Sequence, residues 1–196
     1  MDKQLVLVIG GPGKSGSSTI AKMLADYFGV KRVYGGRFFR EEAKKKGFQS
    51  YNDFLEKMPR KEIEAMDRFF DYKLRDYAKR GSVVIESKTF AGIATKEDIS
   101  CSSKIWLDAR LDVRVQRAID KEGIKSPITR YIRESKMKRD LVLRYRIDGE
   151  RYKKLYDKDY DHPEKYNNLV IDNSNQTPGE TFNLIINFLK DAGVTK

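Results

Sequence analysis

The sequence predicts an α/β fold in which helices cover both faces of a parallel sheet. Short runs of β-forming residues alternate with longer helical stretches, the order that gives parallel strands joined by crossover helices. The runs are apolar at successive positions, which is typical of strands buried on both faces. A glycine-rich segment follows the first run directly. The length of 196 residues fits one compact domain.

The elements of this fold are expected in a regular alternation. The second run of β-formers is the weakest, and Trp106 in the fourth run is expected in the core. The last helix has a clear start, because residues 173–178 supply capping side chains and a proline for its first turn. The expected strands are residues 4–9, 32–34, 83–86, 104–107 and 169–172, and the expected helices are residues 18–28, 36–46, 50–57, 60–80, 111–121, 128–157 and 178–192.

The glycine-rich segment predicts a phosphate-binding loop. Residues 11–18 fit the pattern G-x-x-x-x-G-K-[ST] except at the seventh position, where Ser17 replaces lysine. Glycines allow close approach of the backbone, inward-pointing N–H groups bind anions, and the following helix adds its positive end. Ser18 has the position of the Mg²⁺-binding hydroxyl. The residues assigned to the loop are Gly11, Gly13, Lys14, Ser15, Gly16, Ser17, Ser18 and Thr19.

Lys14 stands three residues before the position of the missing lysine, and two roles are open for it. In the first, its flexible side chain folds over the phosphates and supplies the positive charge that phosphoryl transfer requires. In the second, it points to solvent, and the loop binds phosphate without catalysis or binds nothing.

Composition limits the classes of partner. Lysine and arginine exceed acids by 40 to 29, and a net charge of +11 favours polyanionic ligands without selecting among them; solubility or thermal adaptation explains it equally well. Cys101 is the only cysteine, so an intrachain disulfide is excluded and a reducing cytoplasm is expected. No apolar run approaches the roughly 18 residues of a membrane span, and we expect no signal peptide, since few residues precede the first expected strand. We expect neither a zinc site nor a Ser-His-Asp triad, because His162 is the only histidine and no cysteine lies at ligand spacing from it.

Residues 125–146 form a strongly basic segment with a helical pattern. They contain eight basic residues against two acids, Glu134 and Asp140. Three interpretations are open: a solvated helical hairpin, a lid whose arginines close over phosphates, or a surface that binds nucleic acid.

Charged residues near two strand ends are candidates for substrate binding. Arg37 and Arg40 follow the second strand and lie about one helical turn apart; arginine binds phosphate oxygens in pairs. Glu86 and Lys88 follow the third strand, where ligands of parallel sheets gather. The carboxylate there suits a hydrated Mg²⁺ and the lysine an anionic phosphate, although a salt bridge at the strand end is the alternative.

Asp67 and Asp71 lie four residues apart on an expected helix and therefore share a face. This face is a candidate for binding a base or a ribose. An exposed helix face held by ion pairs is the alternative.

Taken together, these segments resemble the nucleoside monophosphate kinases, and especially archaeal-type cytidylate kinases. Residues 11–22 align without a gap with that family's loop, which reads approximately GPPGSGKTTVAK, and residues 34–41 resemble its SAGDIFRE, with Arg40 on the arginine that binds the monophosphate. Residues 83–88 resemble VVLEGR, residues 104–117 its KIWL stretch, and residues 166–174 its YDLVINTS strand. Arg144 and Arg151 match the paired arginines of the lid.

Three departures from the family pattern stand out. The loop lysine is replaced by Ser17, Arg37 replaces an aspartate, and the basic segment before Arg144 is longer than the family leads us to expect. The first bears on the rate of reaction and the second on the base that is accepted.

The resemblance implies a P-loop NTPase fold: a three-layer α/β/α sandwich with a five-stranded parallel sheet, helices that bind the nucleoside monophosphate, and a helical lid. It implies one domain, residues 1–196. The expected parts are a core of residues 1–33, 82–122 and 166–196, a monophosphate-binding region of residues 34–81, and a lid with flanking helices of residues 123–160.

The implied activity is phosphorylation of a nucleoside monophosphate, CMP or dCMP above all, with ATP and Mg²⁺. The implied partners are small nucleotides, with nucleic acid secondary and no membrane, for a cytoplasmic monomer. Two alternatives are open: a catalytically weak kinase-fold protein that contacts RNA or a ribonucleoprotein, or a kinase for another small metabolite. The implied roles are catalysis for Lys14, Arg144 and Arg151, metal binding for Ser18 and Glu86, and substrate binding for Arg37, Arg40, Asp67, Asp71, Glu86 and Lys88.

Overall fold

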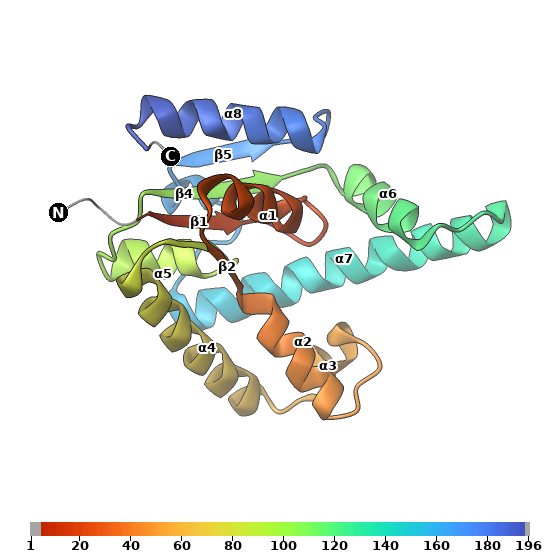
Figure 1. Ribbon diagram of the computed structural model, residues 1–196. Helices are drawn as coiled ribbons and strands as arrows, with labels where there is room; N and C mark the ends of the chain where they lie inside the picture. The colour runs from red at the N-terminus through yellow and green to blue at the C-terminus, as the bar shows by residue number, and fades with distance from the viewer. Residues whose placement is uncertain (1–4, 195–196) are drawn as a thin grey trace.

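The computed structural model describes residues 5–194 and has helices on both faces of one parallel sheet (Figure 1). The strand order is β2-β3-β1-β4-β5, and every neighbouring pair is parallel. The predicted fold class is therefore confirmed. Gln4, the start of the first expected strand, lies outside the described residues. The strands are β1 (Val6–Gly10), β2 (Lys31–Tyr34), β3 (Val83–Glu86), β4 (Ser103–Asp108) and β5 (Leu169–Asp172).

Both faces of the sheet are buried, which explains the continuous apolar runs. In β1, Leu7 and Ile9 belong to the core cluster formed with α1 (Ser17–Phe28) and α8 (Pro178–Asp191), whereas Val6 and Val8 belong to the cluster formed with α4 (Arg60–Arg80) and α5 (Phe90–Lys96). Successive side chains of a strand point to opposite faces, so each face of β1 requires apolar residues. Trp106 is 2% exposed, as predicted.

The helices match the predicted positions to within a few residues, with one exception. The helix α5 was not predicted, because five of its seven residues are buried and it lacks the one-sided apolar pattern of a surface helix. The helices are α1 (Ser17–Phe28), α2 (Gly35–Lys45), α3 (Tyr51–Lys57), α4 (Arg60–Arg80), α5 (Phe90–Lys96), α6 (Leu111–Glu122), α7 (Pro127–Tyr156) and α8 (Pro178–Asp191), with a 3₁₀ turn at Pro163–Lys165. None of the helices in residues 5–194 is long and apolar enough to cross a membrane.

The basic segment lies on α7, a single helix of 30 residues. Its N-terminal part projects from the body of the molecule beside α6 (Figure 1). Leu141 packs there against Val115 and Ile119 of α6. The C-terminal part of α7 lies beside the sheet, where Tyr152 packs with Trp106 of β4. One helix therefore joins a projecting arm, which we define as residues 120–146, to the centre of the molecule.

Candidate active site

The loop between β1 and α1 has the shape of a phosphate-binding turn. A Cβ atom at Gly11 would lie 2.3 Å from the Leu107 carbonyl oxygen and 2.4 Å from Ser15 Oγ, so only glycine fits. Gly16 has a φ of 100° and begins α1 without a side-chain cap. The first N–H groups of α1 are thus free of a capping side chain, which is the arrangement that binds anions.

Three side chains from distant segments hold the carbonyl groups of this loop. Arg114 Nε donates to the Gly13 oxygen at 2.8 Å, Arg117 Nη1 donates to the Ser15 oxygen at 3.3 Å, and Asn173 Nδ2 donates to the same oxygen at 2.9 Å. The C=O and N–H of a peptide unit point in opposite directions, so anchoring the carbonyls turns the N–H groups the other way. The sequence analysis did not assign Arg114 or Arg117 to the loop, because arginine on an amphipathic helix is usually a surface charge. It treated Asn173 only as part of the turn before the last helix.

Ser18 and Glu86, the two predicted metal residues, lie together. Ser18 Oγ donates to Glu86 Oε1 at 2.5 Å, and Glu86 Oε2 accepts from Arg32 Nε at 3.0 Å and from Arg32 Nη2 at 2.5 Å. The salt bridge that we considered as an alternative for Glu86 is therefore present, from a residue that the sequence analysis missed.

The donor set of Ser18 and Glu86 fits Mg²⁺. This ion prefers oxygen ligands, and it commonly takes one or two from the protein and the rest from phosphates and water. Within residues 5–194, no cluster of three or more histidine, cysteine, aspartate or glutamate side chains could hold a metal ion. A metal bound at Ser18 and Glu86 would thus depend on a phosphate ligand for part of its coordination.

Three predicted cations converge on one carboxylate that was not predicted. Asp148 is completely buried, and its oxygens accept from Lys88 Nζ at 2.6 Å, Arg144 Nε at 3.0 Å and Arg151 Nη2 at 3.3 Å. Burial alone would raise the pKa of Asp148, but the three cations hold it well below its usual range. We call these four residues the Asp148 cluster. It carries three positive charges against one negative charge.

The pKa of Lys88 is perturbed mainly by burial. Burial lowers the pKa of its ammonium group to about 8, although the nearby Asp148 acts in the opposite direction. Lys158, which is 1% exposed, donates a hydrogen bond to the Lys88 carbonyl oxygen. Burial and the Lys88 charge lower the pKa of Lys158 to about 7. A second anion at this place would therefore be favourable.

Aromatic rings surround the two arginines of the Asp148 cluster. The Arg144 guanidinium lies 3.9 Å from the centre of the Tyr51 ring, and that of Arg151 lies 4.9 Å from the Tyr152 ring and 5.5 Å from Phe39. These contacts orient the guanidinium planes. They join helices α2 and α3 to α7.

Asp67 and Asp71 are buried, so the exposed ion-paired face that we considered for them is wrong. The helix face that they share packs against α7, where Asp67 Oδ2 lies 3.2 Å from Arg151 Nε and Asp71 accepts a hydrogen bond from Tyr156. Burial raises the pKa of Asp67 to about 7 against the opposing charge of Arg151. Both aspartates therefore contact side chains of α7. Their role in binding a base or a ribose stays a prediction.

Lys14, Arg37 and Arg40 lie at the surface. Arg37 pairs with Glu41 at 2.6 Å, and Arg40 lies 5.0 Å from the Tyr34 ring centre. The pKa of Glu122 is lowered by a hydrogen bond from Arg133 and further by the charge of Lys14, which therefore lies toward the end of α6. No hydrogen bond or ion pair joins the three to the Asp148 cluster within residues 5–194, and their predicted roles stay predictions.

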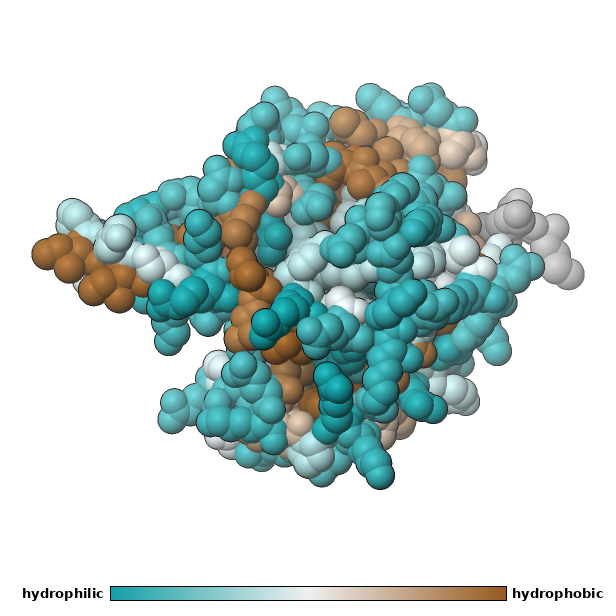
Figure 2. Space-filling view, turned by 180° about the vertical axis from the view of Figure 1, so that it is seen from behind, coloured by the Kyte–Doolittle hydropathy of each residue, from teal (hydrophilic) through white to brown (hydrophobic). Residues whose placement is uncertain are grey.

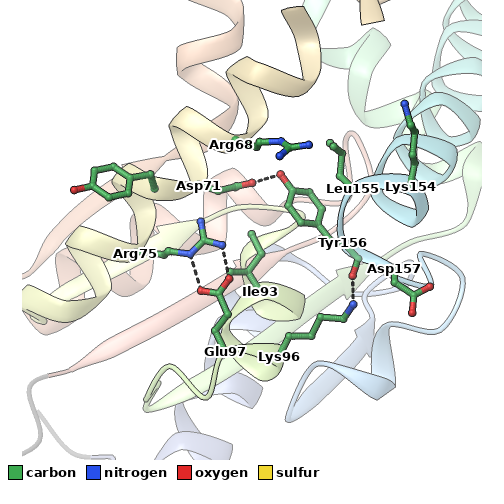
Figure 3. Close-up of a pocket in the computed structure, with 11 residues that line it drawn as sticks. Arg68, Asp71, Arg75, Ile93, Lys96, Glu97, Lys154, Leu155, Tyr156 and Asp157 are labelled. Atoms are coloured by element: carbon green, nitrogen blue, oxygen red, sulfur yellow. Dashed lines mark hydrogen bonds and ion pairs between the residues drawn. The ribbon is translucent and has the colours of Figure 1, made fainter. Parts of the chain in front are cut away.

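A cavity of about 690 Å³ opens between α4, α5 and the end of α7 (Figure 3). The hydrogen bond between Tyr156 and Asp71 lies in its wall, and Arg75 holds Glu97 beside it. No residue of the loop or of the Asp148 cluster lines this cavity. This cavity is therefore separate from the loop and from the Asp148 cluster.

Comparisons with known proteins agree with this geometry. A family model described as AAA domain matches residues 9–143, more than half of the chain. The fold is similar to that of a shikimate kinase from Acinetobacter baumannii in complex with shikimate, with a TM-score of 0.61, 12% identity, and coverage of 99% of this chain and 97% of the other.

Two curated relatives match nearly the whole chain. A cytidylate kinase from Methanopyrus kandleri is 32% identical and covers 92% of this chain and 91% of its own length. A cytidylate kinase from Pyrococcus horikoshii is also 32% identical, with coverage of 93% and 86%. The chain therefore belongs to the P-loop nucleoside monophosphate kinase family, as the motifs predicted.

Proposed function

We propose that this protein transfers the γ-phosphoryl group of ATP to a nucleoside monophosphate, with CMP or dCMP as the acceptor. The observation that carries the proposal is the Asp148 cluster, a partly buried group of three cations against one carboxylate. Lys88 of this cluster is only two residues beyond Glu86, which contacts the first residues of α1. The positive cluster and the phosphate-binding loop are thus neighbours.

The loop would bind the donor phosphates through its N–H groups, held by Arg114, Arg117 and Asn173. Ser18 and Glu86 would hold Mg²⁺. When bound, this ion supplies positive charge that neutralises the phosphate oxygens of ATP. Phosphoryl transfer depends mainly on positioning and on such charge stabilisation.

Lys88, Arg144 and Arg151 would bind the acceptor phosphate and the group in transfer. An oxygen of the acceptor phosphate forms a bond to the γ-phosphorus, and the bond from that phosphorus to the β–γ bridging oxygen breaks, leaving ADP. The acceptor oxygen is already anionic, so no general base is required. Asp148 would keep the cations in place before the phosphates arrive.

The remaining assignments follow the family pattern. Arg37 and Arg40 would contact the monophosphate, and Asp67 and Asp71 the base or ribose. Lys14 would replace the lysine absent at position 17. The region of residues 34–81 would close on the acceptor and residues 123–160 on the donor. The names of the two relatives support a cytidine nucleotide as the acceptor.

A coupled assay of ADP release tests the proposal. The acceptors are CMP, dCMP, UMP, AMP, GMP and dTMP, each with ATP and Mg²⁺. We expect the highest kcat/KM with CMP or dCMP. A rate at background level for all six acceptors would refute the kinase assignment, and a preference for a purine acceptor would refute the substrate assignment alone.

A further inference from the structure

The outward face of α7 is occupied by none of the chain's own elements in residues 5–194. At 3.6 residues per turn, positions 128, 131, 132, 139, 142 and 146 share one side of the helix. This side extends about 27 Å, given a rise of about 1.5 Å per residue. The exposed fractions are 76% for Ile128, 73% for Tyr131, 60% for Ile132 and 51% for Val142, and Arg139 and Arg146 are also exposed.

The opposite face of α7 is fully used by contacts to α6. Leu141 and Met137 pack against apolar residues of α6. Arg130 pairs with Asp120 at 3.0 Å, and Arg133 pairs with Glu122 at 2.6 Å. The helix therefore has one face for the protein itself and one for solvent.

The ion pairs of the arm leave its other cations uncompensated. Three of the four acids of the arm, Asp120, Glu122 and Glu134, are paired with Arg130 or Arg133, and the charge of the fourth, Asp140, acts on Arg133. Six exposed cations have neither an ion pair nor a hydrogen bond among the described residues. They are Lys121, Lys125, Lys136, Lys138, Arg139 and Arg146. Arg139 and Arg146 lie on the outward face, Lys136 and Lys138 flank it on either side, and Lys121 and Lys125 lie at the junction of α6 and α7. We call these six residues the cationic track, and their charge favours a polyanionic partner.

Apolar side chains lie at the end of this track. Figure 2 shows apolar surface at the tip of the projecting arm, next to hydrophilic surface. Tyr131 lies there between Ile128 and Ile132, and all three are largely exposed. An aromatic ring beside a cationic track is the combination with which proteins bind single-stranded nucleic acid, since bases stack on the ring and phosphates contact the cations.

We propose that the outward face of the arm binds single-stranded RNA, with a base stacked on Tyr131 and phosphates along the six uncompensated cations. Ile128 and Ile132 add apolar contacts beside the stacked base. An acidic protein surface would also suit the cations, but the exposed ring favours RNA. The proposal does not depend on the proposed reaction, because none of the six cations belongs to the Asp148 cluster.

The salt dependence of binding tests the cationic track. We would measure the fluorescence anisotropy of a fluorescein-labelled 12-nucleotide oligouridine between 50 and 300 mM KCl. Six phosphate contacts predict a slope of log K against log salt of about −4. The triple variant Lys136→Gln, Lys138→Gln, Arg139→Gln should reduce the slope to about −2. Replacing the exposed lysines Lys44, Lys45 and Lys61 by glutamine removes the same charge elsewhere and should leave the slope unchanged.

Substitution of Tyr131 tests the stacking contact. Tyr131→Ala should weaken binding about tenfold at constant salt, whereas Tyr131→Phe should keep it. Tyr72→Ala is the matched control, since Tyr72 is 70% exposed on α4. Circular dichroism would show that the variants are folded.

Three results would overturn the proposal. One is the absence of oligouridine binding at 50 mM KCl. Another is equal weakening by the two triple variants, since binding would then follow net charge rather than the arm. The third is full binding by Tyr131→Ala, which would show that no base stacks on this ring.

Discussion

Replacement of Asp148 by asparagine tests the electrostatic design of the site, because it removes one charge and keeps the shape. Asp148 is fully buried with Lys88, Arg144 and Arg151 around it. Removing one partner of a buried ion pair costs about 3–5 kcal/mol. Lys88 can relieve its share by losing its proton, because burial already lowers its pKa to about 8 and the variant lacks the Asp148 charge that raises it. The arginines cannot, so we expect a loss of about 3 kcal/mol.

The pH dependence separates this charge effect from a packing defect. The folded-state pKa of Asp148 is depressed by the three cations. Its contribution to stability is therefore present above the unfolded pKa of about 4 and is lost as the pH falls through the lower folded pKa. The difference in unfolding free energy between the wild type and Asp148→Asn should shrink as the pH falls below about 4, because Asp148 then becomes protonated in the wild type.

Urea denaturation followed by circular dichroism and Trp106 fluorescence measures this difference. Glu150→Gln is the matched control on the same helix, since Glu150 is exposed and lies 3.8 Å from its partner Arg60. Exposed pairs of this kind contribute little. A loss below about 1 kcal/mol for Asp148→Asn, or a difference that does not change at acidic pH, would refute the reasoning.

Three other predictions concern side chains around the site. Lys14→Ala should lower kcat at least about tenfold in the coupled assay if Lys14 replaces the missing loop lysine; an unchanged kcat would show that it only faces solvent. Arg117→Ala removes donors to the Ser15 and Asn173 oxygens and should weaken ATP binding about fivefold by calorimetry, and equal affinity would exclude a role in holding the loop. Burial lowers the pKa of Lys158 to about 7, so between pH 7 and pH 9 the unfolded chain binds more protons than the folded one and the stability of the wild type rises. Lys158→Met should remove this part of the rise in urea denaturation, and parallel pH profiles of wild type and variant would contradict the prediction.

The sheet was predictable because its signals are local. Residues of β1 must be apolar on both faces, and this requirement is visible in five consecutive positions. The start of α8 was predictable for the same reason, since Thr177 and Glu180 form a capping box within four residues. The helix α5 was not, because burial on all sides removes the periodicity by which helices are recognised.

The partners of the site residues could not be predicted, because the fold brings them together from distant segments. Arg114 contacts Gly13 across 101 positions of the chain, and Lys88 contacts Asp148 across 60. Motifs marked Lys88 and Arg151 as cations but not the carboxylate between them. Asp148 follows a basic segment, where an acid is ordinarily a solvated ion-pair partner. Its burial, and not its position in the sequence, distinguishes it.

The Asp148 cluster bears on which property the absence of lysine at position 17 affects. The lysine of the usual loop supplies one ammonium group to the transferring phosphates. The Asp148 cluster has two more positive than negative charges, and Glu86 is already neutralised by Arg32. Asp67, which lies 3.2 Å from Arg151, offsets part of this charge. The cluster therefore offers positive charge to a phosphate chain without a lysine at position 17. What Ser17 removes is a cation fixed at the loop itself, so we expect the substitution to affect the position of the γ-phosphate more than the affinity for ATP. Ser17→Lys should then raise kcat while leaving the dissociation constant of ATP nearly unchanged, and a gain in affinity alone would contradict this view.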